Sequence, residues 1–479
     1  MKPVLSVLAM VFASGFASAE DKPAGWYQFR GPGGTGIAVG QKPPTEVGPD
    51  KNVKWKIKVP AGFSSPIIVA GKVILTAFDS GKLYTITYDE ADGKELWRAE
   101  APAAKIEAFH KTEGSPAAST PVTDGTRIVS YFGSAGLFCY DLTGKELWKF
   151  EMPMAVTAAD FGTGTSPILV DGTIVLVRDE KTDPKIVVID ATTGSLKWEK
   201  KRQSPTSYCT PIVWNTPTGK QIVSGGYGRM IAYDAKTGDE IWSVAGMPSA
   251  CCTSPIVVDD TLFFAGWSPG DAEDKDFKMP TFDKLLEADA NKDGKLSREE
   301  SENSFLKGFF DNNDTDKDGF ITRDEWDATI KFMSAGKNSA MAIKSGGKGD
   351  ITKTHVIWKK TKGLPYVPSG VVIGGQLVLV KDGGLVTAYD TKTGSEIYGQ
   401  ERVVAAGRYY ASAVAANGNI YFTMLDDGTI TVLKAGEKMP EVVVKNPKLG
   451  ERVAATPAIA NDTLFVRTAG HLYAFTEKK

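Results

Sequence analysis

The sequence predicts an all-β fold, an eight-bladed β-propeller that carries a small α-helical insertion in its fifth blade. Three observations lead to this prediction. A turn motif that ends in tryptophan returns along the chain, a small polar residue opens each of eight short β-rich runs, and one interval between these runs is far longer than the others. A unit that returns every ~20–50 residues is typical of solenoids and propellers.

The turn motif is best seen in YDLTGKELW, Tyr140–Trp148. In this pattern an Asp carboxylate can accept hydrogen bonds from backbone N–H groups two or three residues on, and Gly supplies the positive φ of a tight hairpin. The Trp then falls on an outer strand, where its large apolar surface can pack against the next blade. Related segments are Tyr88–Trp97, Ile189–Trp198, Tyr233–Trp242 and Tyr389–Tyr398.

The second motif marks where each blade begins. It occurs at Ser65-Pro66, Thr120-Pro121, Ser166-Pro167, Thr210-Pro211, Ser254-Pro255, Ser369-Gly370, Ser412-Ala413 and Thr456-Pro457. Successive copies lie 43 to 55 residues apart, apart from one interval of 115. Each ordinary interval holds short β-branched or aromatic runs separated by Gly-containing turns, which fits the four strands of a propeller blade.

The segment after the eighth opening, Thr456-Pro457, holds three short β-rich runs and no tryptophan. The missing strand is found near the N-terminus, where VKWKIKV (53–59) precedes the first Ser-Pro by the usual interval. We expect this strand to complete the eighth blade and close the ring, because an open sheet would leave an unpaired edge. The predicted organisation is a signal peptide (1–19), an N-terminal lead (20–52), propeller residues 53–268, an insertion (269–337) and propeller residues 338–479.

The N-terminus has the features of a secretory signal. Lys2 precedes the apolar run Val4–Phe12, and Ala17 and Ala19 are the small residues that signal peptidase needs, so cleavage is expected after Ala19. The alternative is an unprocessed N-terminal helix. No later segment has the ~20 apolar residues needed to span a bilayer. The prediction is a periplasmic or secreted protein without a membrane span.

The long interval contains two complete EF-hand loops, DANKDGKLSREE (289–300) and DTDKDGFITRDE (314–325). Oxygen ligands at positions 1, 3, 5, 7, 9 and 12, with Gly at 6, select Ca²⁺. Two Ca²⁺ sites are therefore predicted, with ligands Asp289, Asn291, Asp293, the carbonyl of Lys295, Ser297 and Glu300 in the first loop, and Asp314, Asp316, Asp318, the carbonyl of Phe320, Thr322 and Glu325 in the second.

The sequence around the two loops has the helical apolar spacing of EF-hands in residues 282–287, 305–310 and 326–333. Only thirteen residues, 301–313, separate the loops, which is too few for two full helices. Whether the two loops bind cooperatively is therefore open. The alternative to a metal site is an acidic, solvated loop.

The repeats, the lead QFRGP (Gln28–Pro32), the segment Gly346–Gly370 and the ending Ala455–Phe475 resemble those of exported bacterial propellers with pyrroloquinoline-quinone (PQQ) repeats. This family includes quinoprotein-like enzymes and BamB-like proteins. The resemblance covers essentially the whole mature chain, and it implies the fold more than the activity, because this fold hosts enzymes and binding scaffolds alike.

In alcohol-oxidising quinoproteins a vicinal cysteine pair closes a disulfide over PQQ, and the resemblance makes Cys251 and Cys252 candidate cofactor-binding residues. No Glu/Asn/Asp set that would hold Ca²⁺ against PQQ is evident in the sequence, and no catalytic residue is assigned, so PQQ is not expected. A structural bridge from Cys209 to the Cys251–Cys252 pair is an alternative. Cysteine connectivity does not follow from sequence.

The favoured function is a non-catalytic, exported, Ca²⁺-binding scaffold that contacts a protein or glycan partner on a propeller face and acts as a monomer. One alternative is a PQQ-dependent dehydrogenase for alcohols or sugars, and another is a BamB-like component of outer-membrane assembly. The net charge of −2 gives no basis for binding nucleic acid. No zinc-spaced His/Cys cluster, GxSxG elbow or GxxxxGK[ST] loop is present.

Overall fold

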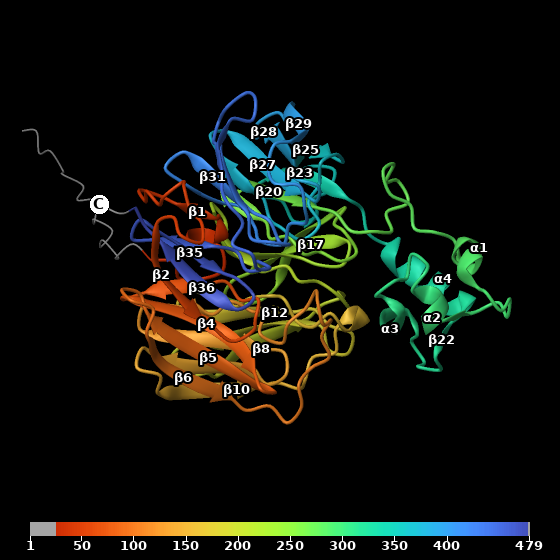
Figure 1. Ribbon diagram of the computed structural model, residues 1–479, viewed down its shortest axis with the longest axis horizontal. Helices are drawn as coiled ribbons and strands as arrows, with labels where there is room; N and C mark the ends of the chain where they lie inside the picture. Colours follow the sequence, from red (N-terminus) through yellow and green to blue (C-terminus); the bar gives the residue numbers. More distant parts are fainter. Residues whose placement is uncertain (1–24, 478–479) are drawn as a thin grey trace, which may run out of the picture.

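The structure is a computed structural model that describes residues 25–477. Eight antiparallel sheets form the blades of a propeller, and a group of short helices, α1 to α4, lies beside them (Figure 1). The predicted all-β fold with a helical insertion in blade five is confirmed. The predicted signal peptide, Met1–Ala19, lies outside the described residues.

The first four blades follow one another along the chain. Their strands are β3 (Ile67–Val69), β4 (Lys72–Asp79), β5 (Lys82–Asp89) and β6 (Glu95–Ala101) in blade one; β7 (Val122–Thr123), β8 (Arg127–Phe132), β9 (Gly136–Asp141) and β10 (Glu146–Glu151) in blade two; β11 (Ile168–Val170), β12 (Thr173–Arg178), β13 (Lys185–Asp190) and β14 (Leu196–Lys201) in blade three; and β15 (Ile212–Thr216), β16 (Gly219–Gly225), β17 (Arg229–Asp234) and β18 (Glu240–Ala245) in blade four.

Blade five is interrupted by the insertion, and blade eight combines the two ends of the chain. The strands are β19 (Ile256–Val258), β20 (Thr261–Gly266), β23 (Ser339–Lys344) and β25 (Val356–Lys360) in blade five; β26 (Val371–Ile373), β27 (Gln376–Lys381), β28 (Leu385–Asp390) and β29 (Glu396–Arg402) in blade six; β30 (Val414–Ala416), β31 (Asn419–Thr423), β32 (Ile430–Lys434) and β33 (Val442–Lys445) in blade seven; and β34 (Ala458–Ala460), β35 (Thr463–Arg467), β36 (His471–Phe475) and β2 (Val53–Lys58) in blade eight.

Strand β2 closes the ring. It pairs antiparallel with β36, placing Trp55 opposite Ala474 and Ile57 opposite Leu472. Two short strands add to other blades in parallel: β1 (Ile37–Ala38) beside β30, and β24 (Gly349–Asp350) beside β18. None of the helices in residues 25–477 combines the length and apolar character needed to cross a membrane.

The tryptophans of the turn motif join neighbouring blades, as the sequence predicted. At four junctions the indole N–H donates to a backbone carbonyl in the turn of the next blade, and the ring covers the glycine of that turn. The pairs are Trp55 with Glu90, Trp97 with Leu142, Trp148 with Ala191, and Trp358 with Thr391, at 3.0 to 3.1 Å. Trp242 instead donates to the Gln221 side chain of its own blade, and residues 345–355, which join β23 to β25 in blade five, lack the turn motif.

The small polar residues that open the blades lie around the central channel of the propeller and are joined by hydrogen bonds. The backbone N–H of one residue donates to the hydroxyl oxygen of its counterpart in the next blade. Six such links, at 2.9 to 3.1 Å, join Ser65 to Thr120, Thr120 to Ser166, Ser166 to Thr210, Ser254 to Ser369, Ser369 to Ser412, and Ser412 to Thr456. The hydroxyl at this position is thus structural, satisfying a buried N–H group.

The N-terminal lead fills the channel. Arg30 is fully buried and donates hydrogen bonds to Ser369 and Gly370 of blade six and to Ala413 of blade seven. Burial lowers the pKa of Arg30 to about 9. The 3₁₀ helix η1 (Pro32–Gly34) contacts β15 of blade four. One short segment therefore touches several blades and fixes the centre of the ring.

The insertion lies between β20 and β23. Its elements are α1 (Phe282–Leu285), η3 (Leu286–Ala288), β21 (Leu296–Ser297), α2 (Arg298–Ser301), α3 (Phe310–Asn313), β22 (Phe320–Ile321) and α4 (Arg323–Met333). Residues 305–310, expected to be helical, are mostly turns, and α3 begins at Phe310. Helix α2 ends at Ser301, and Gly308, with a φ of +76°, lies in the turn before α3. We call residues 281–333 the EF-hand module.

Candidate functional site

The two EF-hand loops lie side by side and are joined by a short β-sheet. Strands β21 and β22 pair antiparallel, with Leu296 opposite Ile321 and Ser297 opposite Phe320. Leu296 and Ile321 are the apolar residues at position 8 of each loop, and both are fully buried in the core of the module. Despite the short connection, the loops therefore have the side-by-side arrangement of an EF-hand pair.

The second loop brings its carboxylates together. Oxygen atoms of Asp314, Asp316 and Glu325 lie within 4.8 Å of one another. Asp314 is buried, and its Oδ1 has no hydrogen-bond partner, whereas Oδ2 accepts from the N–H of Gly319 at 3.1 Å. A buried carboxylate oxygen without a partner is costly unless a cation satisfies it. This donor set therefore fits Ca²⁺.

The remaining ligands of the second loop are held by its backbone. Asp318 Oδ1 accepts from the N–H of Phe320 at 2.9 Å, which fixes the Gly319–Phe320 peptide, just before the carbonyl at position 7. Thr322 is the N-cap of α4 and donates its hydroxyl to Glu325 at 2.8 Å. Gly319 has a φ of +91°, which gives the sharp turn at position 6.

The first loop has the same backbone path but a looser set of side chains. Asp289 accepts from the N–H groups of Lys292 and Gly294, and Asp293 accepts from that of Lys295, at 2.7 to 2.9 Å. The Asn291 amide nitrogen donates to Asp293 at 3.1 Å. Among the residues the structure describes, only the second loop brings the ligand atoms of three His, Cys, Asp or Glu side chains within 4.8 Å of one another, whereas position 3 of the first loop is the amide of Asn291.

The glutamates at position 12 are positioned by capping boxes. Glu300 accepts from the N–H and hydroxyl of Ser297, and these bonds, with those from Ala290 and Asn291, lower the pKa of Glu300. Burial by itself raises the pKa of Glu325, but hydrogen bonds from Thr322 and Thr315 outweigh it and hold that pKa below its usual value. Both groups are thus carboxylates at neutral pH.

The structure places the predicted cofactor residues in different environments. Cys251 is fully buried, its thiol donates to the carbonyl of Thr253 at 3.7 Å, and both its sulfur and that of Cys209 lie against Gly225. Cys252 is partly exposed, with its Sγ 3.7 Å from the carbonyl of Ala250. All four cysteines are free thiols, and burial raises the pKa of Cys252 to about 12. The structure therefore brings together Cys209 and Cys251, from neighbouring blades.

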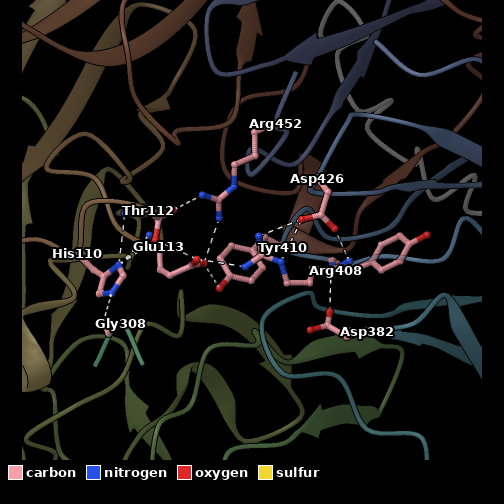
Figure 2. Close-up of polar contacts among 10 residues, drawn as sticks. His110, Thr112, Glu113, Gly308, Asp382, Arg408, Tyr410, Asp426 and Arg452 are labelled. Carbon is pink, nitrogen blue, oxygen red and sulfur yellow. Dashed lines mark hydrogen bonds and ion pairs between the residues drawn. The ribbon is translucent and has the colours of Figure 1, made fainter. Parts of the chain in front are cut away.

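A polar cluster lies at the channel mouth, on the same side as the EF-hand module (Figure 2). Glu113 pairs with Arg408 at 3.2 Å and with Arg452 at 3.1 Å, and accepts from the hydroxyl of Tyr410. Arg408 also pairs with Asp426 at 3.0 Å. Burial raises the pKa of Glu113, but Tyr410 and the two guanidinium groups outweigh it and lower that pKa.

The connection between blades one and two, residues 102–118, carries Glu113 to this position. The same connection contacts the EF-hand module, where His110 Nε2 lies 3.4 Å from the carbonyl of Gly308 (Figure 2). The His110 ring also stacks on Phe161, in the connection between blades two and three, at 5.4 Å. No motif in the sequence marks Glu113, Arg408 or Arg452. The one signal was the interval of 55 residues across this connection, about ten more than the usual spacing.

Comparisons with known proteins agree with this architecture. A family model described as the outer membrane protein assembly factor BamB matches residues 84–244 and 348–478, and a model of the EF hand matches residues 282–301 and 306–331. No curated protein matches the chain.

Two of the solved structures that the chain resembles have TM-scores above 0.5 and share its fold at low identity. BamB from Moraxella catarrhalis is 13% identical, with a TM-score of 0.54 over 88% of this chain and 98% of that one. The computationally designed Ika8 protein is 12% identical, with a TM-score of 0.56 over 89% and 100%. A europium-containing methanol dehydrogenase is 10% identical, with a TM-score of 0.45 over 95% and 99%.

The two matched segments of the BamB model cover more than half of the chain and flank the EF-hand match on both sides. The chain therefore belongs to the family described as the outer membrane protein assembly factor BamB, and it carries an EF-hand pair within its fifth blade.

Proposed function

We propose that this protein is an exported, Ca²⁺-binding propeller without catalytic activity that serves as a scaffold for a protein or glycan partner. The observation that carries the metal proposal is the convergence of Asp314, Asp316 and Glu325 around a buried, unpaired oxygen of Asp314. Ca²⁺ would supply the positive charge that these carboxylates lack, and would link the loop to the start of α4.

The proposed ligands are those expected from loop spacing. In the second loop they are Asp314, Asp316, Asp318, the carbonyl of Phe320, Thr322 and Glu325; in the first, Asp289, Asn291, Asp293, the carbonyl of Lys295, Ser297 and Glu300. Because the two loops pair through β21 and β22, each ion would influence the other loop.

Calorimetric titration with Ca²⁺ tests this proposal. Wild type should bind two ions, with dissociation constants of about 10⁻⁴ to 10⁻³ M, as is common for extracellular modules. The double variant Glu300→Gln, Glu325→Gln should lose the binding heats. Equal heats for wild type and double variant would contradict the metal site.

Export is proposed from the N-terminal sequence. Expression of the full chain in a Gram-negative bacterium, followed by cell fractionation and N-terminal sequencing, should give a periplasmic or secreted protein that begins at Glu20. A chain that retains Met1 in the cytoplasm would overturn this part of the proposal.

A protein contact is supported by the rim of the propeller. The outer strands β6, β10 and β14 of three successive blades each expose a leucine, namely Leu96, Leu147 and Leu196, at 43 to 45%. Pull-down from envelope extracts, comparing wild type with a variant in which these three leucines are glutamate, should show a partner that wild type retains and the variant loses. An outer-membrane assembly complex among the retained proteins would favour the role named in the family's description.

The alternative is a PQQ-dependent dehydrogenase that uses Cys251 and Cys252. The residues at the channel mouth weigh against it: the carboxylate there is that of Glu113, and two arginines already neutralise it. Addition of PQQ and Ca²⁺ to the purified protein, with measurement of cofactor absorbance and dye-linked alcohol or sugar oxidation, distinguishes the two functions. Stoichiometric PQQ binding with turnover would establish the enzyme instead.

A further inference from the structure

A cavity of about 690 Å³ lies between the EF-hand module and the channel mouth of the propeller. Its floor includes Phe29 of the N-terminal lead and hydroxyl-bearing residues of the ring, such as Thr120. Its roof includes Phe305 and Trp326 of the module. Cavities of roughly 300–1,000 Å³ with mostly apolar walls are typical of sites for small organic molecules.

The roof is fastened to the propeller on two sides. On one side the Asn312 amide nitrogen donates to the carbonyl of Ala159, in the connection between blades two and three. On the other the Tyr227 hydroxyl of blade four donates to the carbonyl of Phe332 at 2.7 Å, and their rings stack at 4.9 Å. The space is therefore bounded above and below, which suits a small molecule better than an extended peptide.

The walls favour an aromatic, uncharged ligand. Aromatic rings face the cavity from both parts, with Phe305, Phe309 and Trp326 above and Tyr208 and Tyr366 below. Such rings bind other rings by offset stacking and by edge-to-face contact. Burial raises the pKa of both tyrosines, so each keeps its hydroxyl proton and can donate a hydrogen bond.

The charges in the walls are few. Glu113 is already paired with two arginines, and among the described lining residues the one cation is the exposed Lys181. Glu325 also lines the cavity, and the proposed Ca²⁺ would neutralise it. An anionic ligand would thus find little compensation, and a neutral one would lose little hydration on entry.

We propose that this cavity binds an uncharged aromatic small molecule that carries a hydrogen-bond acceptor. Helix α4 links this site to the metal, which rests on the proposed Ca²⁺ function: Glu325 stands in its first turn, and Trp326, Thr329 and Phe332 of the same helix line the cavity. Ca²⁺ and the aromatic ligand should therefore each raise the affinity of the other, because linkage between two sites is reciprocal.

Fluorescence titration with N-phenyl-1-naphthylamine, a neutral aromatic probe that brightens in apolar surroundings, tests the cavity. Wild type should bind one probe per chain. Ala328→Trp should weaken this binding at least tenfold, because Ala328 lines the cavity on α4 and a large side chain there would occupy it. Asp327→Trp is the matched control, since Asp327 is exposed on the same helix and is not part of the cavity wall.

Titrations in chelator and in saturating Ca²⁺ test the link, with a tighter probe affinity in Ca²⁺ by a factor of about 5 to 150 expected. The proposed small-molecule site would be overturned if wild type bound no probe or if Ala328→Trp bound it equally well. The first result would also be expected if a side chain of a protein partner, and not a small molecule, is the occupant of this cavity. Ca²⁺ heats without a change in probe affinity would overturn the link. Absence of Ca²⁺ heats would overturn the proposed metal function, while the titration in chelator still decides the cavity.

Discussion

The indole N–H of Trp148 donates a hydrogen bond of 3.0 Å to the backbone carbonyl of Ala191 in the next blade. The same ring covers Gly194, where a Cβ atom would lie 2.7 Å from the indole. The tryptophan that ends one turn motif and the glycine in the next are therefore two halves of one contact, repeated around the ring.

Substitutions of Trp148 should distinguish the stability that its aromatic ring contributes from the stability that its hydrogen bond contributes. Trp148→Phe should lower the free energy of unfolding by about 1 kcal/mol, since it keeps most of the apolar surface but loses the N–H. Trp148→Ala should cost about 3–5 kcal/mol. Urea unfolding measures both. The neighbouring Leu147→Ala, at a position 44% exposed, serves as control and should cost under about 0.5 kcal/mol; equal losses for all three would contradict the contact.

The ring of hydroxyls around the channel gives a second prediction. Thr120 Oγ1 accepts from the buried N–H of Ser65 at 3.0 Å, so Thr120→Val should leave that N–H without a partner and lower stability by about 1–3 kcal/mol. Thr120→Ser keeps the acceptor and should recover most of the loss in the same urea experiment. If serine were as destabilising as valine, the hydroxyl would not be what matters.

The two EF-hand loops should differ in affinity. The second loop already gathers Asp314, Asp316 and Glu325, whereas the first is looser. In a calorimetric titration Glu325→Gln should therefore remove the tighter binding step, and Glu300→Gln the weaker one. The reverse assignment would show that the convergence of the carboxylates without the ion does not decide affinity.

Glu107 should make stability depend on pH. Burial raises its pKa from 4.5 to about 7, against a hydrogen bond of 2.8 Å from the Thr163 hydroxyl. Between these pH values the folded protein holds one more proton than the unfolded chain, so the free energy of unfolding falls as pH rises from 4.5 to 7, by at most about 3 kcal/mol.

Glu107→Gln removes this titration and keeps an oxygen that can accept from Thr163. Thermal unfolding across this pH range should therefore show a shallower decline for the variant than for wild type. An identical pH profile for the two proteins would mean that Glu107 is ionised in the folded state at pH 5.

Much of the fold was predictable because its signals are local. Each blade is built from neighbouring strands and one turn, so its pattern is contiguous in sequence, and counting the openings gave eight blades. The EF-hand loops are equally local, since all six ligand positions fall within twelve residues. Residues 305–310 are the exception: their apolar spacing predicts a helix, but the short connection and Gly308 make a turn.

The sequence by itself therefore determined the blade count and the place of the insertion in the chain, and it supplied the twelve ligand positions on which the metal proposal rests. Only the tertiary structure decided what lies at the centre. Arg30 of the QFRGP lead fills the channel, Glu113 meets Arg408 and Arg452 some 300 residues away, and Cys251 meets Cys209. Such contacts join side chains far apart along the chain, and no period or spacing in one sequence specifies them, because closure of the ring brings them together.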